Sequence, residues 1–249
     1  MSASATNEHG QPIGPALYFT AAPHPKEMGQ PLQEFHGRVC VLKHLDDSHS
    51  EPLRKVLTDP IHDKDFTYMP YSQPKNQAEW DEWFKARATP LDPFVYAICA
   101  RASSDSPLEV LGQIGYLNIF PNNGTIEIGH VLFSPKLQRS RVATEAVYLL
   151  INAAFEGGYR RVEWKCDALN ARSRRAAERF GMEFEGIFRQ HWVYKGRSRD
   201  TAWFAIIDKD WTWAQKGYEA WLSDDNFDEK GMQKRTLEQC RGDRHQKSV

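Results

Sequence analysis

The fold is decided by residues 124–144, which read GTIEIGHVLFSPKLQRSRVAT. The side chains of Thr125–Phe133 suit a strand, with apolar and polar residues alternating at its start. Pro135 ends the strand, because proline has no backbone N–H to donate to a neighbouring strand. From Val142, apolar residues recur at helical spacing as far as Gly157, so we expect the strand to turn directly into a helix.

The same kinds of pattern predict further elements on both sides of this stretch. The predicted strands are Arg38–Lys43, Phe94–Ala100, Val110–Ile119, Thr125–Phe133, Arg161–Cys166, Met182–His191 and Thr201–Ile207. The predicted helices are Asp47–Leu57, Gln77–Ala88, Val142–Gly157, a helix between the N-cap Asn170 and Gly181, and a helix from Asp210 onward. We therefore predict an α/β fold in which helices cover both faces of a mixed sheet of about seven strands.

The chain divides into one domain and two additions. Residues 1–36 contain five prolines and little apolar periodicity, which predicts an extended arm. Residues 37–208 form the predicted domain, and residues 209–249 form a helical extension with a polar tail that we expect to fray.

The composition is typical of a soluble globular protein, with 41% hydrophobic and 26% charged residues. The apolar runs are too short to cross a membrane and the N-terminus lacks a secretory signal, so we expect a cytoplasmic protein without a membrane partner. A formal net charge of -1 argues against a nucleic-acid partner. The four cysteines are widely spaced, so neither a metal site nor a disulfide framework is expected.

The predicted helix at Val142 begins next to two arginines. Its first backbone N–H groups have no intrahelical partners, and together with the helix dipole they suit a pyrophosphate. Arg139 and Arg141 add positive charge at that point. An equally weighted alternative is that both arginines are solvated while Gln138 and Ser140 simply cap the helix.

The sequence around this turn resembles the GNAT superfamily of acetyl-CoA-dependent N-acetyltransferases, specifically its RimJ/RimL-like branch. The resemblance covers residues 37–208 and implies a sheet splayed between its fourth and fifth strands, with acetyl-CoA as co-substrate. Its motifs occur in the family order: Ile126-Glu-Ile-Gly-His130, Leu137-Gln-Arg-Ser-Arg-Val-Ala-Thr-Glu-Ala146, Asn170-Ala-Arg-Ser173 and Glu178-Arg-Phe-Gly-Met182.

The resemblance also implies which residues hold the co-substrate: the turn amides for the pyrophosphate, the end of the fourth strand for the pantetheine arm, and the helix after Asn170 for the region of the thiol. The implied cofactor-binding residues are Leu132, Phe133, Gln138, Arg139, Ser140, Arg141, Val142, Ala143, Thr144, Asn170 and Ser173. Arg141 departs from the family pattern, in which glycine usually lets the backbone approach the phosphate. Its side chain must turn outward, where it either adds a phosphate contact or weakens cofactor binding.

Two residues are candidates for the chemistry. Glu127 is a carboxylate in an otherwise apolar central strand, which suits a general base that removes a proton from the acceptor amine. A structural ion pair is an equally weighted interpretation of Glu127. Strand alternation places Glu127 and His130 on opposite faces of the sheet. Ser173 is implied to hydrogen-bond or protonate the departing thiolate, although Ser173 and Asn170 can also serve only to cap their helix.

These observations predict an N-acetyltransferase that works by direct attack in a ternary complex. Cys166 is better described as a small buried strand residue than as an acyl-carrying nucleophile. The acceptor is a protein N-terminus or a small amine or amino acid, and we expect the 66–71 loop and the Lys195–Arg199 turn to select it. The alternative function is a catalytically inactive acyl-CoA-binding protein. The oligomeric state, monomer or homodimer, stays open.

Overall fold

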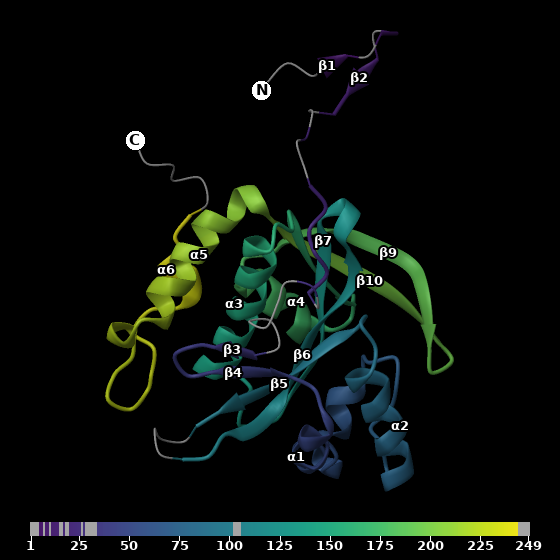
Figure 1. The fold of residues 1–249 in the computed structure, drawn as a ribbon, viewed down its shortest axis with the longest axis vertical. Helices are drawn as coiled ribbons and strands as arrows, with labels where there is room; N and C mark the ends of the chain where they lie inside the picture. Colours follow the sequence, from purple (N-terminus) through teal and green to yellow (C-terminus); the bar gives the residue numbers. More distant parts are fainter. Residues whose placement is uncertain are drawn as a thin grey trace.

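A computed structural model of the chain describes residues 5–6, 8–9, 11–14, 17, 20–25, 27, 34–101 and 106–243. An eight-stranded sheet runs through the molecule with helices on both of its faces (Figure 1). The strand order is β3-β4-β5-β6-β7-β8-β10-β9. The strands of this sheet are β3 (Glu34–His36), β4 (Val41–His44), β5 (Phe94–Ala100), β6 (Glu109–Phe120), β7 (Thr125–Phe133), β8 (Arg161–Asp167), β9 (Glu183–Tyr194) and β10 (Arg197–Ile207).

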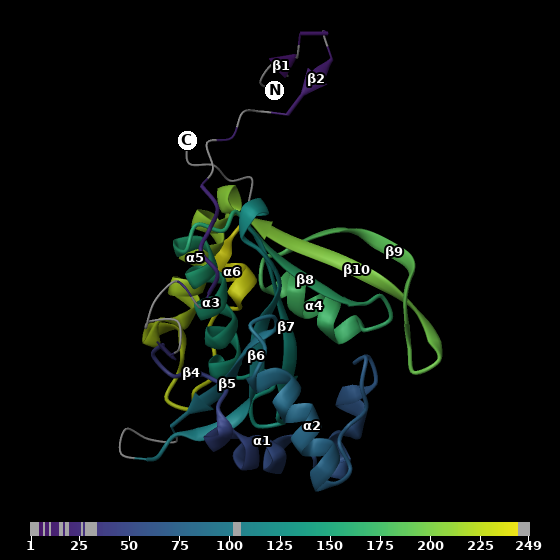
Figure 2. The same ribbon diagram turned by 45° about the vertical axis from the view of Figure 1, so that its right-hand side comes forward.

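The helices lie in two groups on opposite faces of this sheet. The α-helices are α1 (Ser50–Leu57), α2 (Gln77–Ala88), α3 (Arg141–Glu156), α4 (Ala171–Arg179), α5 (Asp208–Leu222) and α6 (Leu237–Arg241). Short 3-10 turns add η2 (Asp47–His49), η3 (Pro60–Phe66), η4 (Pro121–Asn123) and η5 (Asp224–Asn226). In Figure 2, α1 and α2 lie away from the group formed by α3, α5 and α6, and the β9–β10 hairpin projects from the sheet.

The core follows the alternation of the strands. All seven residues of β5 are buried, and they divide between two hydrophobic clusters. Phe94, Tyr96 and Ile98 belong to the cluster that includes α3 and α5, whereas Val95 and Ala97 pack with α1 and α2. A strand covered by helices on both sides reads as a continuous apolar run, which explains why its sequence shows no polar face.

Helix α3 is fastened to the edge of the sheet by a buried carboxylate. Glu145, only 2% exposed, accepts backbone N–H groups from Arg38, Val39 and Cys40 at 2.7 to 2.8 Å. Gly37 leaves room for this contact, because a Cβ there would lie 2.4 Å from the carboxylate carbon. The β3–β4 turn is therefore held directly against the first turns of α3.

The predicted α/β fold with a mixed sheet is confirmed, with eight strands in place of about seven. The added strand, β3, lies inside the segment predicted as an extended arm and pairs with β4. Elsewhere in the arm, Ala5–Thr6 (β1) pairs with Pro12–Ile13 (β2), and the remaining arm residues are only partly within the described ranges. Strand β10 begins at Arg197, so the predicted basic turn is shorter than Lys195–Arg199.

The described part of the C-terminal extension, as far as residue 243, packs on the domain. Beyond Asp228, Leu237 of α6 is fully buried and Arg241 donates to Arg179 O at 2.8 Å. Within the described ranges, no helix combines the length and apolar character needed to cross a bilayer.

Candidate active site

Strands β7 and β8 separate at the centre of the sheet. They pair in parallel only where Thr125–Glu127 lies beside Arg161–Glu163. Beyond these residues the two strands continue to Phe133 and Asp167 without pairing to each other. The predicted splay between the fourth and fifth strands of the domain is confirmed. Backbone groups that face this opening can hydrogen-bond an extended polar chain placed between the strands.

A group of free backbone donors lies at the start of α3. Ser140 is the N-cap, and its Oγ accepts the N–H of Ala143 at 3.0 Å. In the part of the chain that the structure describes, the N–H groups of Arg139, Arg141 and Val142 donate to no protein acceptor. Together with the positive end of the helix dipole, these three donors form a seat for a phosphate group.

The side chain of Arg141 points away from this seat, toward the C-terminal extension. Its Nη2 donates to Leu222 O and, at 2.6 Å, to Asp224 Oδ1. Its guanidinium group lies 4.4 Å from the centre of the Phe227 ring. The charge of Arg141 is therefore engaged by a neighbouring carboxylate, while its backbone N–H stays free.

The other side chains predicted to bind the cofactor mainly hold the turn together. Gln138 Nε2 donates to Phe133 O at 3.1 Å, and the buried Thr144 accepts from Arg179 Nη1 at 3.1 Å. Leu132 is buried in the cluster with α1 and α2, whereas Phe133 packs against the opposite cluster. The turn therefore presents a set of unpaired backbone donors.

Glu127 lies in a buried ion-pair network. Only 5% of this residue is exposed, and its Oε2 accepts from Asn118 Nδ2 and Lys165 Nζ, both at 2.7 Å. Lys165 Nζ also contacts Glu163 Oε2 at 2.8 Å and lies 4.1 Å from the centre of the Trp203 ring. Burial raises the pKa of Glu127, although Lys165 and Asn118 oppose that rise. Both interpretations of Glu127, ion pair and base, fit this geometry.

A bulge in β7 overturns the predicted alternation. The register between β6 and β7 shifts between Gln113 and Gly115, opposite His130, which has a positive φ of 50°. As a result Leu132 packs on the α1–α2 side, while Ile126 packs on the other side. The charge of Arg87, on α2, acts on His130 and helps burial lower its pKa to about 4. The strict alternation on which the predicted placement of Glu127 and His130 rested is therefore broken at the bulge.

Ser173 is held beside the opening by an indole group. Its Oγ accepts from Trp164 Nε1 at 2.9 Å, so the hydroxyl proton of Ser173 is available to another acceptor. Asn170 caps α4 by accepting the N–H of Ser173 at 3.1 Å, as its sequence position suggested. Cys166 is buried, and burial raises the pKa of its thiol despite contact with Ser173. This thiol is therefore a weak nucleophile.

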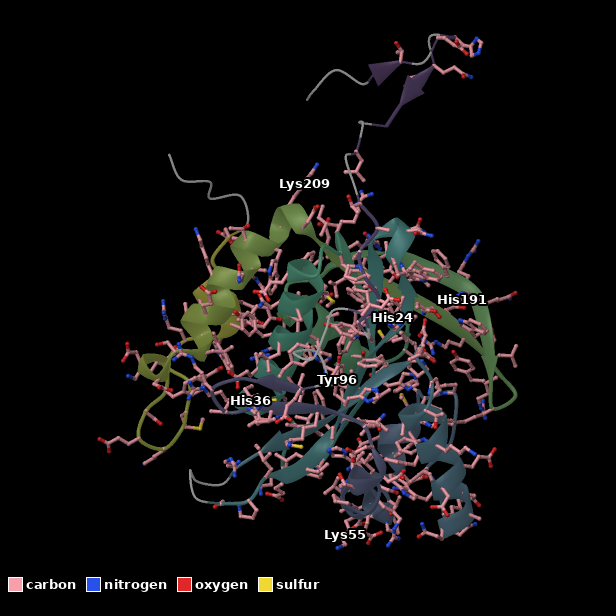
Figure 3. The ribbon with its side chains drawn as sticks, in the orientation of Figure 1. His24, His36, Lys55, Tyr96, His191 and Lys209 are labelled. Carbon is pink, nitrogen blue, oxygen red and sulfur yellow. The ribbon has the colours of Figure 1, made fainter. Side chains whose placement is uncertain are left out.

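The two segments predicted to select the acceptor touch each other. Lys195 Nζ, at the tip of the β9–β10 hairpin, donates to Phe66 O at the end of η3 at 2.7 Å. The hairpin also carries exposed aromatic residues, including Phe188 and Trp192 at 52% exposure each. His191, labelled on the hairpin in Figure 3, contacts Thr201 Oγ1 at 3.0 Å. The hairpin and the 60–71 segment thus meet on the α2 side of the opening.

Sequence reasoning missed Asn118 and Lys165, the two partners of Glu127. The sequence could have placed Lys165 on the same face as Glu163, because both residues alternate with the buried Val162 and Trp164 along β8. Asn118 had no such signal, because it reaches Glu127 from a β6 irregularity with a positive φ of 47°. No group of three or more potential metal ligands occurs among the described residues.

Comparisons with known proteins agree with this arrangement. Residues 40–183 match the family model described as "Acetyltransferase (GNAT) domain". A crystal structure of a GCN5-related N-acetyltransferase from Brucella melitensis is 39% identical and has a TM-score of 0.84, covering 90% of this chain and 98% of its own. A probable GNAT acetyltransferase from Chromobacterium violaceum is 38% identical, with a TM-score of 0.72 and coverage of 81% and 97%.

More distant structures share the fold. RimL, a ribosomal L7/L12 alpha-N-protein acetyltransferase solved in complex with coenzyme A, is 20% identical, with a TM-score of 0.57 and coverage of 69% of this chain and 95% of its own. No curated protein matches the chain significantly. The family match spans more than half of the chain and agrees with the splayed strands and the free amides of α3. The chain belongs to the GNAT family and is an N-acetyltransferase.

Proposed function

We propose that the enzyme transfers an acetyl group from acetyl-CoA to a primary amine by direct attack within a ternary complex. One observation supports this proposal. The unpaired stretch between β7 and β8 is followed directly, after the end of β7, by the free N–H groups at the start of α3. An extended, amide-containing chain that ends in a pyrophosphate needs both features. Acetyl-CoA supplies the activated thioester when bound.

The residues present fit this co-substrate. The N–H groups of Arg139, Arg141 and Val142 would hold the pyrophosphate, and the free edge of β7 near Leu132 and Phe133 would hold the pantetheine arm. We call this the donor side of the opening. The side formed by α2, η3 and the β9–β10 hairpin is the acceptor side.

Glu127 and Ser173 have distinct roles in the proposal. Glu127 accepts a proton from the acceptor amine, directly or through water, and its raised pKa makes it a stronger base than an exposed carboxylate. Ser173 donates its hydroxyl proton, which is not used in the hydrogen bond with Trp164, to the departing sulfur. The raised pKa and burial of Cys166 support direct attack over an acyl-cysteine route.

The proposed acceptor is a protein N-terminus or a small amine. RimL is named for acetylation of an α-amino group on a ribosomal protein, which supports the first class through shared fold. The open acceptor side, with exposed aromatic residues on the β9–β10 hairpin, is compatible with a polypeptide segment.

Calorimetry followed by a thiol-release assay tests the proposal. We expect acetyl-CoA to bind, and pantetheine, which lacks the pyrophosphate, to bind at least about a hundredfold more weakly because it cannot use the amides of α3. Thiol release should then require an amine from a panel of peptides and small amines. Binding without release for any acceptor would favour the inactive acyl-CoA-binding alternative, and no binding at all would reject both functions.

A further inference from the structure

Arg87 is a buried cation that lacks an anionic partner. It lies in the last turn of α2 and is only 5% exposed. Its guanidinium group lies 3.8 Å from the centre of the Trp83 ring and 4.3 Å from that of Tyr71, and its Nη1 donates to Trp83 O at 2.5 Å. Among the described residues, no carboxylate forms an ion pair with it, and its Nε has no hydrogen-bond partner. Buried charges in proteins are normally paired, so this one requires an explanation.

Other buried polar atoms in this part of the molecule are also left without partners. His130 Nδ1 and Gln113 Oε1 are both buried and unbonded, although Gln113 Nε2 donates to His130 O at 3.0 Å. The indole N–H of Trp83 is likewise unpaired. The two rings can stabilise the guanidinium group and Trp83 O accepts one of its N–H groups, but Arg87 Nε and the indole N–H remain without an acceptor. The cluster is therefore polar, cationic and incompletely satisfied.

This cluster lies next to the proposed reaction centre. Trp83, whose ring contacts Arg87, packs in the same buried cluster as Leu132, which follows the β7 bulge at His130. Tyr71, whose ring centre lies 4.3 Å from the guanidinium carbon of Arg87, belongs to the loop between η3 and α2. A ligand group at Arg87 would therefore belong to a molecule on the acceptor side. The phosphates of acetyl-CoA have their own seat at α3, so they do not explain Arg87.

We propose that Arg87 binds a carboxylate of the acceptor, so that the enzyme prefers amines that carry a carboxylate group. A planar guanidinium group suits a carboxylate because it can donate two parallel hydrogen bonds. The carboxylate is either the α-carboxylate of an amino acid or the side-chain carboxylate of an acidic residue near a peptide N-terminus. This inference rests on the proposed acetyl transfer and names its substrate class.

Paired acceptors test the inference on the unmodified enzyme. One pair compares free amino acids with their α-carboxamides, and the other compares C-terminally amidated peptides that begin with Asp or Glu with peptides that begin with Asn or Gln. We expect the carboxylate member of one pair to have a kcat/KM about tenfold to a hundredfold higher, and that pair identifies the source of the carboxylate. Equal rates within both pairs would overturn the inference even if no variant could be purified.

Substitution of Arg87 then assigns the preference to this residue. Arg87→Met should remove the preference by slowing the carboxylate acceptor, mainly through a higher KM, far more than the neutral acceptor. Arg87→Lys should keep part of the preference. Arg54→Met is the matched control, because Arg54 lies on α1 and pairs at the surface with Glu51. Equal losses for both acceptors would assign Arg87 a structural role and overturn the inference.

The same measurements separate this inference from the proposed function. Thermal unfolding and calorimetry with acetyl-CoA show whether each variant is folded and binds the donor. If acetyl-CoA does not bind to the unmodified enzyme, the proposed function fails, and the carboxylate preference fails with it. If turnover occurs without a charge preference, only the role of Arg87 is rejected.

Discussion

The donor and acceptor sides of the β7–β8 opening are built from different parts of the chain. The donor side presents backbone N–H groups from one short segment, Arg139–Val142. The acceptor side presents side chains from several elements, including Asn118 of β6, Glu127 of β7, Lys165 of β8 and Arg87 of α2. A site made of backbone tolerates changes of side chain, whereas a site made of buried charges depends on each partner.

The largest expected effect of breaking this arrangement is at Glu127. Glu127→Gln keeps the shape of the side chain but removes the proposed base, so we expect kcat to fall by about 10² to 10⁴ with acetyl-CoA affinity nearly unchanged. The loss should be greatest above the pKa of Glu127 and below that of the acceptor amine, where the amine is protonated and the carboxylate can act as a base. Steady-state kinetics across pH, together with calorimetry, measure both quantities.

Glu163→Gln is the matched control for this prediction. Glu163 shares Lys165 with Glu127 but also pairs with Arg161 Nε at 2.7 Å. Its loss disturbs the same network without removing the proposed base, so we expect a decrease in kcat of less than about tenfold. Similar rates for the unmodified enzyme and Glu127→Gln at every pH would show that Glu127 has only the structural role.

The next effect concerns Lys165 and the pH dependence of the reaction. Lys165 lowers the pKa of Glu127 against the rise caused by burial, so Lys165→Met should raise that pKa further. A base must be deprotonated to act, and activity therefore falls as the pH drops through its pKa. We expect the acidic limb of the kcat profile to move upward by about 1 to 3 pH units.

The position of this limb distinguishes two causes of lower activity. A shifted limb with a recovered plateau at high pH supports the effect of Lys165 on Glu127. A uniform loss at every pH, with the limb in place, would contradict it and indicate that Lys165→Met damages the site by another route. Thermal unfolding of the variant shows whether the protein remains folded during the measurement.

The difference between the two sides also explains what the sequence could predict. Strand β7 and helix α2 were predicted with their observed bounds from local signals: the alternation at the start of β7 with Pro135 after its end, and the helical spacing of Trp80, Trp83 and Phe84 in α2. The α3 turn was predicted from local signals, namely Pro135 and the apolar spacing that follows. The donor side lies within one such local segment, so its position could be predicted from the sequence.

The acceptor side depends on features that leave no local signal. Asn118 and His130 adopt positive φ angles without being glycine, and each accompanies a change of register between β6 and β7. The bulge at His130 changes which residues face α2, and alternation alone cannot reveal it. The pairs Glu127–Lys165 and Arg141–Asp224 join residues that are distant in sequence, so only the folded chain brings them together.

The smallest effect on the donor side is expected at Arg141, where the family usually has glycine. Arg141→Gly leaves the backbone N–H in place and removes a side chain that already contacts Asp224 and Phe227. Acetyl-CoA affinity should therefore change by less than about threefold, while loss of the ring contact lowers Tm by about 2 °C. Calorimetry and thermal unfolding measure these two effects separately.

Arg141→Ala completes this comparison, because it removes the same contacts without giving the backbone the freedom of glycine. If both variants keep the affinity of the unmodified enzyme, the phosphate is bound by the backbone donors at the start of α3. The side chain of Arg141 then serves only to hold the C-terminal extension in place. A loss of affinity of tenfold or more in both variants would show that Arg141 leaves Asp224 to contact the phosphate when acetyl-CoA binds. The donor side would then depend on a charged side chain, as the acceptor side does, and the distinction between the two sides would fail.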